Sequence, residues 1–294
     1  MPSHIPVLSS EVVNLLQLKA GDVAVDATLG GGGHTLAMLK AVGPKGKIIG
    51  IDKDAESITR LRQNSSRQQS NGQLVAIHGS YADVGAIIEG CGYQRVDAIL
   101  FDLGLSTVQL ALARGFSFLE SAPLDMRFDR SCGVTAEDVV NGYSREELAD
   151  ILRRFGQEPA APQIAKAIFE ARRRKRITDA RELAEIVSRA KGGRRGRIHP
   201  ATLTFQALRI EVNGELAALK EALPQALAVL KPSGRVAIIS YHSLEDKLVK
   251  EFFREAARMG KAKLITKKAL QPDYGEIRSN PRARSAKLRV LEKV

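Results

Sequence analysis

The chain has 294 residues, 44% of them hydrophobic, and a formal net charge of +12. This length suits one large domain, or one domain with an insertion, and provides enough apolar residues for a core. No apolar run approaches the ~20 residues of a membrane helix, and the first residues show no signal peptide, so we expect a cytoplasmic protein without membrane contact. Two cysteines without motif spacing exclude a disulfide framework, and the histidines and acids show no metal-ligand spacing.

The positive charge is concentrated in two segments. Residues 172–200 contain eleven Lys or Arg against three Asp or Glu, and residues 261–294 contain ten against three. The rest of the chain is therefore close to neutral. One basic cluster is usually a solvated surface, but two in such a chain favour a polyanionic partner, most often nucleic acid.

The first part of the chain begins with a short extended piece and a helix within 4–18, and then alternates short apolar runs with helical patterns. The apolar runs predict buried strands over 23–25, 47–52, 74–77 and 96–101. Such alternation is typical of parallel βαβ units, in which ligands bind beyond the carboxyl ends of the strands. The residues at those ends are Asp26 and the glycines 30–33, then Asp52, Tyr81 and Asp102.

The strand pattern stops between about residues 111 and 200. Helical periodicity covers 145–155, 161–175 and 180–191, with a capping box at Ser144 and a helix start at Thr178. We expect a helical substrate-recognition domain at 111–199, inserted into an α/β domain formed by 1–110 and 200–294.

The α/β pattern resumes in the last third of the chain. We predict a helix over 203–230 with interruptions at Asn213-Gly214 and Pro224, and a turn at 232–235. A buried strand at 236–240 precedes a helix at 244–257, for which Ser243 is the expected N-cap. Residues 263–266 and 286–291 are predicted strands at the sheet edge.

The glycine loop, with an acid about 20 residues further on, suits either a nicotinamide dinucleotide or S-adenosylmethionine. A dinucleotide needs three spaced glycines around its pyrophosphate, and Gly30-x-Gly32-x-x-Thr35 lacks the third. S-adenosylmethionine has no phosphate, so we favour a methyltransferase. Methylation of a pyrimidine C5 requires a cysteine nucleophile, and neither Cys91 nor Cys132 follows a predicted strand, which favours an amine or hydroxyl acceptor.

The motifs resemble the bacterial ribosomal RNA small-subunit methyltransferase H family, also called MraW. They are His4-x-Pro-Val-Leu, Asp26-x-Thr-x-Gly-Gly-Gly-Gly-His34, Gly50-Ile-Asp-Lys-Asp54, Asp102-Leu-Gly-Leu-Ser-Thr-Val-Gln-Leu110, Gly115-Phe-Ser-Phe, Pro123-Leu-Asp-Met-Arg-Phe-Asp129, His199-Pro-Ala-Thr-Leu-Thr-Phe-Gln-Ala-Leu-Arg209, Ser240-Tyr-His-Ser-Leu-Glu-Asp246 and Asn280-Pro-Arg-Ala-Arg-Ser-Ala-Lys-Leu-Arg289. They run nearly end to end and in this order are highly specific. Two departures stand out: Ser106-Thr107-Val108-Gln109 stands where the family commonly has Ser-Ser-Pro-Gln, and Leu203 stands where it often has an arginine.

The resemblance implies a class I (Rossmann-like) S-adenosylmethionine-dependent methyltransferase sheet with an inserted all-helical domain. It also implies methylation of the exocyclic N4 of a cytidine in the decoding region of small-subunit (16S) ribosomal RNA. The partner would be that RNA or the 30S particle. The protein would act as a monomer or homodimer, and no metal is expected. The cofactor contacts that it implies are Gly32, Gly33, His34, Asp52, Tyr81, Asp102 and Gln109.

The catalytic candidates are Asp102, to accept hydrogen bonds from the amine, and then Ser106 and His242, to contact the base or take a proton. Basic residues 172–176, 194–197 and 282–289 would hold phosphates.

Structural roles stay open for many of these residues. They are loop ordering for Asp26 and Asp102, a plain strand end for Asp52, a helix cap for His34, core packing for Tyr81, a structural histidine for His199 and His242, and an ion pair for Asp125 with Arg127. Two rival functions also remain: a ribose 2′-O-methyltransferase using Lys247, and an RNA-binding assembly factor without chemistry.

Overall fold

The computed structural model describes residues 6–64, 68, 71–105, 109–110, 112–193 and 199–294. The chain forms two compact units, residues 1–106 with 216–294 and residues 107–215. The second unit continues to Glu215, beyond the return at residue 200 expected from the sequence, because the helix Thr202–Asn213 packs against helices of that unit. A substrate-recognition role for the second unit stays a prediction.

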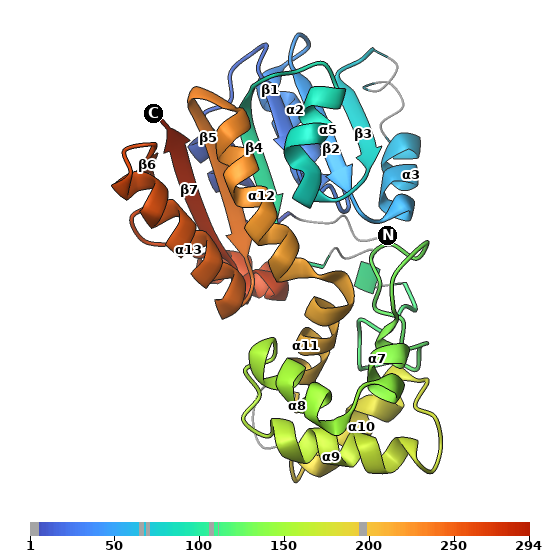
Figure 1. Ribbon diagram of the computed structural model, residues 1–294. Helices are drawn as coiled ribbons and strands as arrows, with labels where there is room; N and C mark the ends of the chain where they lie inside the picture. The colour runs from blue at the N-terminus through green and yellow to red at the C-terminus, as the bar shows by residue number, and fades with distance from the viewer. Residues whose placement is uncertain (1–5, 65–67, 69–70, 106–108, 111, 194–198) are drawn as a thin grey trace. The chain divides into compact units, whose positions relative to one another are not determined.

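The first unit contains one seven-stranded sheet (Figure 1). Its strands are β1 (Val23–Asp26), β2 (Lys47–Asp52), β3 (Leu74–His78), β4 (Val96–Asp102), β5 (Leu230–Ser240), β6 (Ala262–Leu264) and β7 (Lys287–Lys293). Their order is β3-β2-β1-β4-β5-β7-β6; β7 runs antiparallel to both of its neighbours, β5 and β6, and the other neighbouring pairs are parallel. This is the class I methyltransferase sheet, so the predicted fold is confirmed.

Helices cover both faces of the sheet because successive strand residues point to opposite sides. Val25 and Phe101 pack in the core cluster that includes α5 (Val84–Gly90), α12 (Glu215–Val229) and α13 (Ser243–Arg258). Their neighbours Ala24 and Leu100 pack in the cluster that includes α1 (Ser9–Leu16), α2 (Gly33–Val42) and α3 (Ala55–Asn64). The parallel strands end together at one edge of the sheet (Figure 1).

The structure corrects two predictions for the segment that contains α12 and the start of β5. Pro224 lies inside α12 without ending it, since the apolar side chains around it are packed in the core, and this packing outweighs the lost hydrogen bond. The turn predicted at 232–235 is instead an irregularity inside β5, where the strand bulges out of register with β4. Leu230 pairs with Val96 and Arg235 with Ala98, so residues 231–234 stand opposite one residue of β4.

The second unit is helical, as predicted. It contains α7 (Ala136–Gly142), α8 (Arg145–Arg154), α9 (Ala161–Arg172), α10 (Ala180–Ala190) and α11 (Thr202–Asn213). The capping box of Ser144 with Glu147 is confirmed, with bonds of 2.7 and 3.1 Å. The start of α10 differs, because Asp179 and not Thr178 accepts the first backbone N–H groups. In the described part of the chain, no helix combines the length and apolarity that a membrane span requires.

Candidate functional site

Three acids end three neighbouring parallel strands of the first unit. Asp26 is the last residue of β1, Asp52 of β2 and Asp102 of β4. The register pairs Asp26 with Gly50 on one side and Leu100 on the other, so all three carboxylates emerge at the same edge. The sequence-based placement of these side chains at one edge is confirmed.

The glycine loop between β1 and α2 is held to the sheet by its backbone. Ala27 N–H donates to Leu100 O at 2.8 Å and Leu29 N–H to Ile51 O at 2.9 Å. Gly32 then takes a left-handed φ of 77° and is the N-cap of α2, which begins at Gly33. Because this conformation favours glycine, the loop can turn directly from the strand end into the helix.

Asp52 ties this loop to the end of β2. Its Oδ2 accepts the Gly30 N–H at 2.6 Å, and its Oδ1 accepts the Asp54 N–H at 2.7 Å. Burial raises the pKa of the Asp52 carboxyl to about 7, with Asp54 and Asp26 adding to the rise against the two hydrogen bonds. Each carboxylate oxygen has a second lone pair. Asp52 is therefore a fixed acceptor that can take two further donors.

Asp26 is buried beneath the glycine loop and orders it through hydrogen bonds, which is the structural role left open for this residue in the sequence analysis. Its Oδ2 accepts the Thr35 hydroxyl at 2.6 Å, and its Oδ1 accepts the Thr28 N–H at 3.3 Å. The side chain is almost fully buried, and burial raises its pKa. Asp26 thus connects the strand end to the first turn of α2.

Asp102 is held by a hydrogen bond on one carboxylate oxygen, and its other oxygen faces His34. The Tyr241 hydroxyl donates to Oδ1 at 2.7 Å, and His34 Nε2 lies 3.5 Å from Oδ2. The backbone N–H of Asp102 donates to the Thr28 hydroxyl at 2.6 Å. Gly104 admits the tyrosine ring, because a Cβ at this position would lie 2.7 Å from it. These contacts fix one carboxylate at the end of β4.

Tyr241 and Thr28 were missed by sequence reasoning. Tyr241 directly follows β5, which ends at Ser240, so the rule that pointed to the other strand ends also covers it. Burial and the neighbouring Asp102 raise the pKa of Tyr241 well above its usual range. Its phenol therefore stays a proton donor throughout the working pH range.

His34 lies in the first turn of α2 with its ring buried, at 5% exposure. It does not cap the helix, since Gly32 occupies the cap position. Burial acts to lower the pKa of the imidazole, but Asp102, Asp26 and Glu276 outweigh it and the net pKa is raised. Neither ring nitrogen has a hydrogen-bond partner within the described residues.

The remaining cofactor candidates lie in different places. Tyr81 begins a short 3-10 helix (Tyr81–Asp83) after β3 and packs edge-on against Phe101, with ring centroids 5.9 Å apart. This contact fits core packing and also leaves Tyr81 beside the strand ends. Gln109 is buried and belongs to the second unit. Its predicted role stays a prediction.

Two catalytic candidates receive no new support. Ser106 lies outside the described residues. His242, and not Ser243, is the N-cap of α13: its Nδ1 accepts the Glu245 N–H at 3.3 Å, and its Nε2 lies 3.2 Å from Glu245 Oε1. The Nδ1 contact makes the ring of His242 a helix cap, while its buried Nε2 has no hydrogen-bond partner within the described residues.

Parts of the basic segments are engaged within the protein. Arg289 and Lys287 both contact Asp246, at 2.7 and 3.2 Å, and Arg176 contacts Glu137 at 2.7 Å. Residues 194–197 lie outside the described part of the chain. Arg127 forms the expected ion pair with Asp125 at 2.8 Å.

Comparison with known proteins shows the family to which this chain belongs. The family model described as "MraW methylase family" matches residues 1–294. The chain is 46% identical to the ribosomal RNA small subunit methyltransferase H of Persephonella marina, over 100% of both chains. It is 47% identical to the protein of that name from Coprothermobacter proteolyticus, over 99% of this chain and 96% of the other. The corresponding protein of Thermomicrobium roseum is 44% identical over 99% and 94%.

Proposed function

Because the chain belongs to the MraW methylase family, we propose that it transfers a methyl group from S-adenosylmethionine to the exocyclic N4 of a cytidine in small-subunit ribosomal RNA. The observation that carries the proposal is the arrangement around Asp102. A carboxylate that is hydrogen-bonded to Tyr241, faces His34 and ends a central parallel strand suits an acceptor group that must be oriented through its N–H bonds.

The residues at the strand ends fit the proposed cofactor. The Asp52 carboxyl is half-buried with a pKa raised to about 7, and two hydroxyl donors of a ribose would satisfy its remaining lone pairs. The loop from Gly30 to Gly33 would pass along the methionine part, and it has no third glycine for a pyrophosphate. Bound there, S-adenosylmethionine supplies an electrophilic methyl group on a sulfonium sulfur.

The protein's own contribution is positioning and proton handling. A cytosine amine is a weak nucleophile because its lone pair is delocalised into the ring. A hydrogen bond from the amine to Asp102 turns the lone pair out of conjugation and holds it in line. When nitrogen bonds the methyl carbon it loses a proton, and Asp102 Oδ2 is the acceptor, with His34 Nε2 3.5 Å away to share the charge. The base must be presented unpaired.

Two observations favour an amine over the rival acceptors. A ribose 2′-oxygen would need a lysine, but Lys247 is 70% exposed on α13 and pairs with Glu251. A pyrimidine C5 would need a cysteine nucleophile at the strand ends, but Cys91 is the C-cap of α5. That position precedes β4 and so lies toward the opposite edge of the sheet.

The test is to incubate the protein with methyl-labelled S-adenosylmethionine and small-subunit particles from a strain that lacks the modification. Digestion to nucleosides and mass spectrometry then identify the methylated atom. We expect label on N4 of a cytidine, and its loss in Asp102→Ala. Label on a 2′-oxygen or on C5 would overturn the proposal, and no label would favour an assembly factor without chemistry.

A further inference from the structure

A groove on the second unit combines aromatic rings with arginines. It has a volume of about 380 Å³. Its lining side chains are Phe118, Arg181, Ala184, Glu185, Ser188, Arg189 and His199, and we call it the α10 groove because five of them belong to that helix. It lies wholly within the residues of the second unit.

The rings of the α10 groove form a supported stack. Phe118 and His199 are nearly parallel, 18° apart, with centroids at 4.4 Å. Phe118 is backed by the edge of Phe205, a buried residue of α11, at 5.3 Å. His199 Nδ1 accepts the Ala201 N–H at 3.2 Å, which fixes the imidazole plane. Both outer rings remain half-exposed, so a fixed aromatic surface faces the groove.

The charges beside the rings suit a phosphate backbone. Arg181 is 63% exposed and only loosely paired with Glu185, at 3.5 Å. Arg189 is exposed on the next turns of α10, and its Nε donates to the backbone oxygen of Glu185 at 3.3 Å. The groove thus carries two cations against one acid, and it lies in the most basic segment of the chain. Aromatic surfaces flanked by arginines are typical of sites for unpaired RNA.

We propose that the α10 groove binds an unpaired nucleotide of the substrate RNA. The base stacks against the Phe118–His199 pair, and Arg181 and Arg189 hold the adjacent phosphates. The proposal rests on the proposed function in taking RNA as the substrate. Such a site would hold the strand next to the target cytidine or elsewhere in the same RNA, and it would recognise the strand without selecting a base.

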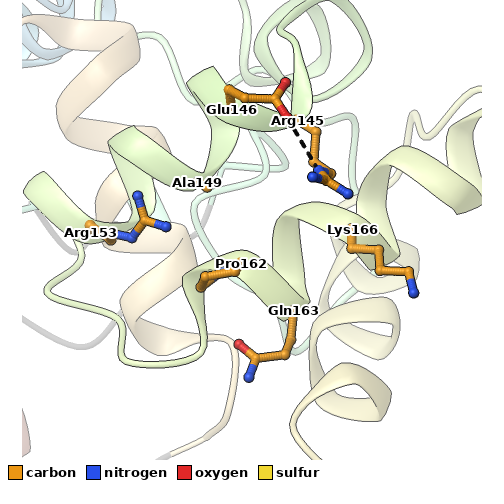
Figure 2. A pocket seen from close by; sticks show the side chains of 7 residues that line it. All are labelled: Arg145, Glu146, Ala149, Arg153, Pro162, Gln163 and Lys166. Atoms are coloured by element: carbon orange, nitrogen blue, oxygen red, sulfur yellow. Dashed lines mark ion pairs between the residues drawn. The ribbon is translucent and has the colours of Figure 1, made fainter.

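A second groove of the same unit provides a matched control. It lies between α8 and α9, has a volume of about 470 Å³, and is lined by Arg145, Glu146, Ala149, Arg153, Pro162, Gln163 and Lys166 (Figure 2). Figure 2 shows its cationic side chains extending from both helices. None of these seven side chains is aromatic, so this groove offers charge without stacking.

The test of stacking is the affinity of the full-length protein for a fluorescein-labelled, single-stranded oligoribonucleotide, measured by anisotropy. Phe118→Leu keeps an apolar side chain against Phe205 but removes the π surface, and we expect binding to weaken by roughly 5- to 150-fold. Phe118→Tyr keeps the ring and should bind as the wild type does. Thermal unfolding of both variants controls for stability. Equal affinity of Phe118→Leu and wild type would overturn the proposal.

The test of the phosphate contacts is the salt dependence of the same affinity. Removing two contacts in Arg181→Gln/Arg189→Gln should reduce the slope of log K against log salt by about 1.4. The control pair Arg145→Gln/Lys166→Gln, which removes the same charge from the α8–α9 groove, should change the slope by much less. An equal change in both pairs would contradict a specific role for the α10 groove.

A crosslinking experiment separates this proposal from the proposed function. Small-subunit particles containing 4-thiouridine are irradiated with the protein, and the crosslinked peptides are identified by mass spectrometry. We expect RNA adducts at Phe118 or His199. RNA adducts found only elsewhere on the protein would overturn the groove proposal while N4 methylation by the wild type still stood. Failure of N4 methylation with intact groove adducts would overturn only the proposed function.

Discussion

Removing one hydroxyl group from Tyr241 tests the positioning of Asp102. Tyr241→Phe keeps the ring beside Gly104 but deletes the 2.7 Å hydrogen bond to Asp102 Oδ1. The backbone bond to Thr28 and the proximity of His34 remain, so the carboxylate keeps its place at the end of β4 but loses its fixed rotation.

The size of the effect follows from the kind of hydrogen bond that is lost. A hydrogen bond to a charged group contributes about 1.5–3 kcal/mol, equivalent to roughly 10- to 150-fold in rate if all of it is expressed in the transition state. We therefore expect kcat for RNA methylation to fall by about that factor. The Kd for S-adenosylmethionine should change little, because Tyr241 contacts neither the glycine loop nor Asp52 by a hydrogen bond in the described structure.

The matched control is Tyr143→Phe in the second unit. Tyr143 donates to Glu211 Oε1 at the same 2.7 Å, so the change is chemically identical and should have a similar cost in stability. Single-turnover methylation of RNA and urea unfolding are measured for both variants. Full activity of Tyr241→Phe, or equal loss of activity in both variants, would refute the positioning role.

Three further predictions concern the cofactor loop. Protonation of Asp52 removes an acceptor site that the two backbone N–H groups and two ribose hydroxyls together need, and its pKa is about 7. Affinity for S-adenosylmethionine should therefore fall by up to about ten-fold per pH unit below 7 and level off above it. Titration calorimetry across this pH range should show the dependence of S-adenosylmethionine affinity on pH in the wild type and no such dependence in Asp52→Asn. A wild-type affinity that does not change with pH would contradict the prediction. Gly32→Ala should lower stability and cofactor affinity, since φ is 77° and the new Cβ lies 2.6 Å from a leucine side chain. As a control, Gly21→Ala, with φ of 91° and open space around the new Cβ, should lower the free energy of unfolding only by the backbone strain of about 1–2 kcal/mol. An equal loss of stability in both variants would show that the contact of the new Cβ at residue 32 with the leucine has no effect. Thr35→Val leaves one oxygen of buried Asp26 without its 2.6 Å donor, so urea unfolding should show a loss of about 1–3 kcal/mol, and an unchanged midpoint would count against it.

Much of the fold was predictable because strand periodicity and strand-end acids are local features. The apolar runs before Asp26, Asp52 and Asp102 each identify a strand, and a parallel sheet brings the ends of such strands to one edge. The composition of the loop after β1 also favoured S-adenosylmethionine over a dinucleotide, because the third spaced glycine is missing.

What the sequence could not provide depends on contacts between distant residues. The Tyr241 hydroxyl reaches Asp102 only because β4 and β5 are adjacent, although 139 positions separate the two residues. Ser243 was the expected cap by residue preference, but the ring of His242 fills that place, since an imidazole nitrogen can also accept a backbone N–H. The stacking of Phe118 on His199 likewise follows from tertiary packing of the helical unit.

The most direct test of the central claim is a crystal structure of the protein with S-adenosylhomocysteine, the product that remains after methyl transfer. We predict both ribose hydroxyls on the Asp52 carboxylate, the homocysteine part along Gly30–Gly33, and the sulfur facing Asp102. A ligand bound away from the carboxyl ends of β1, β2 and β4, or one that leaves Asp52 without contact, would contradict the account.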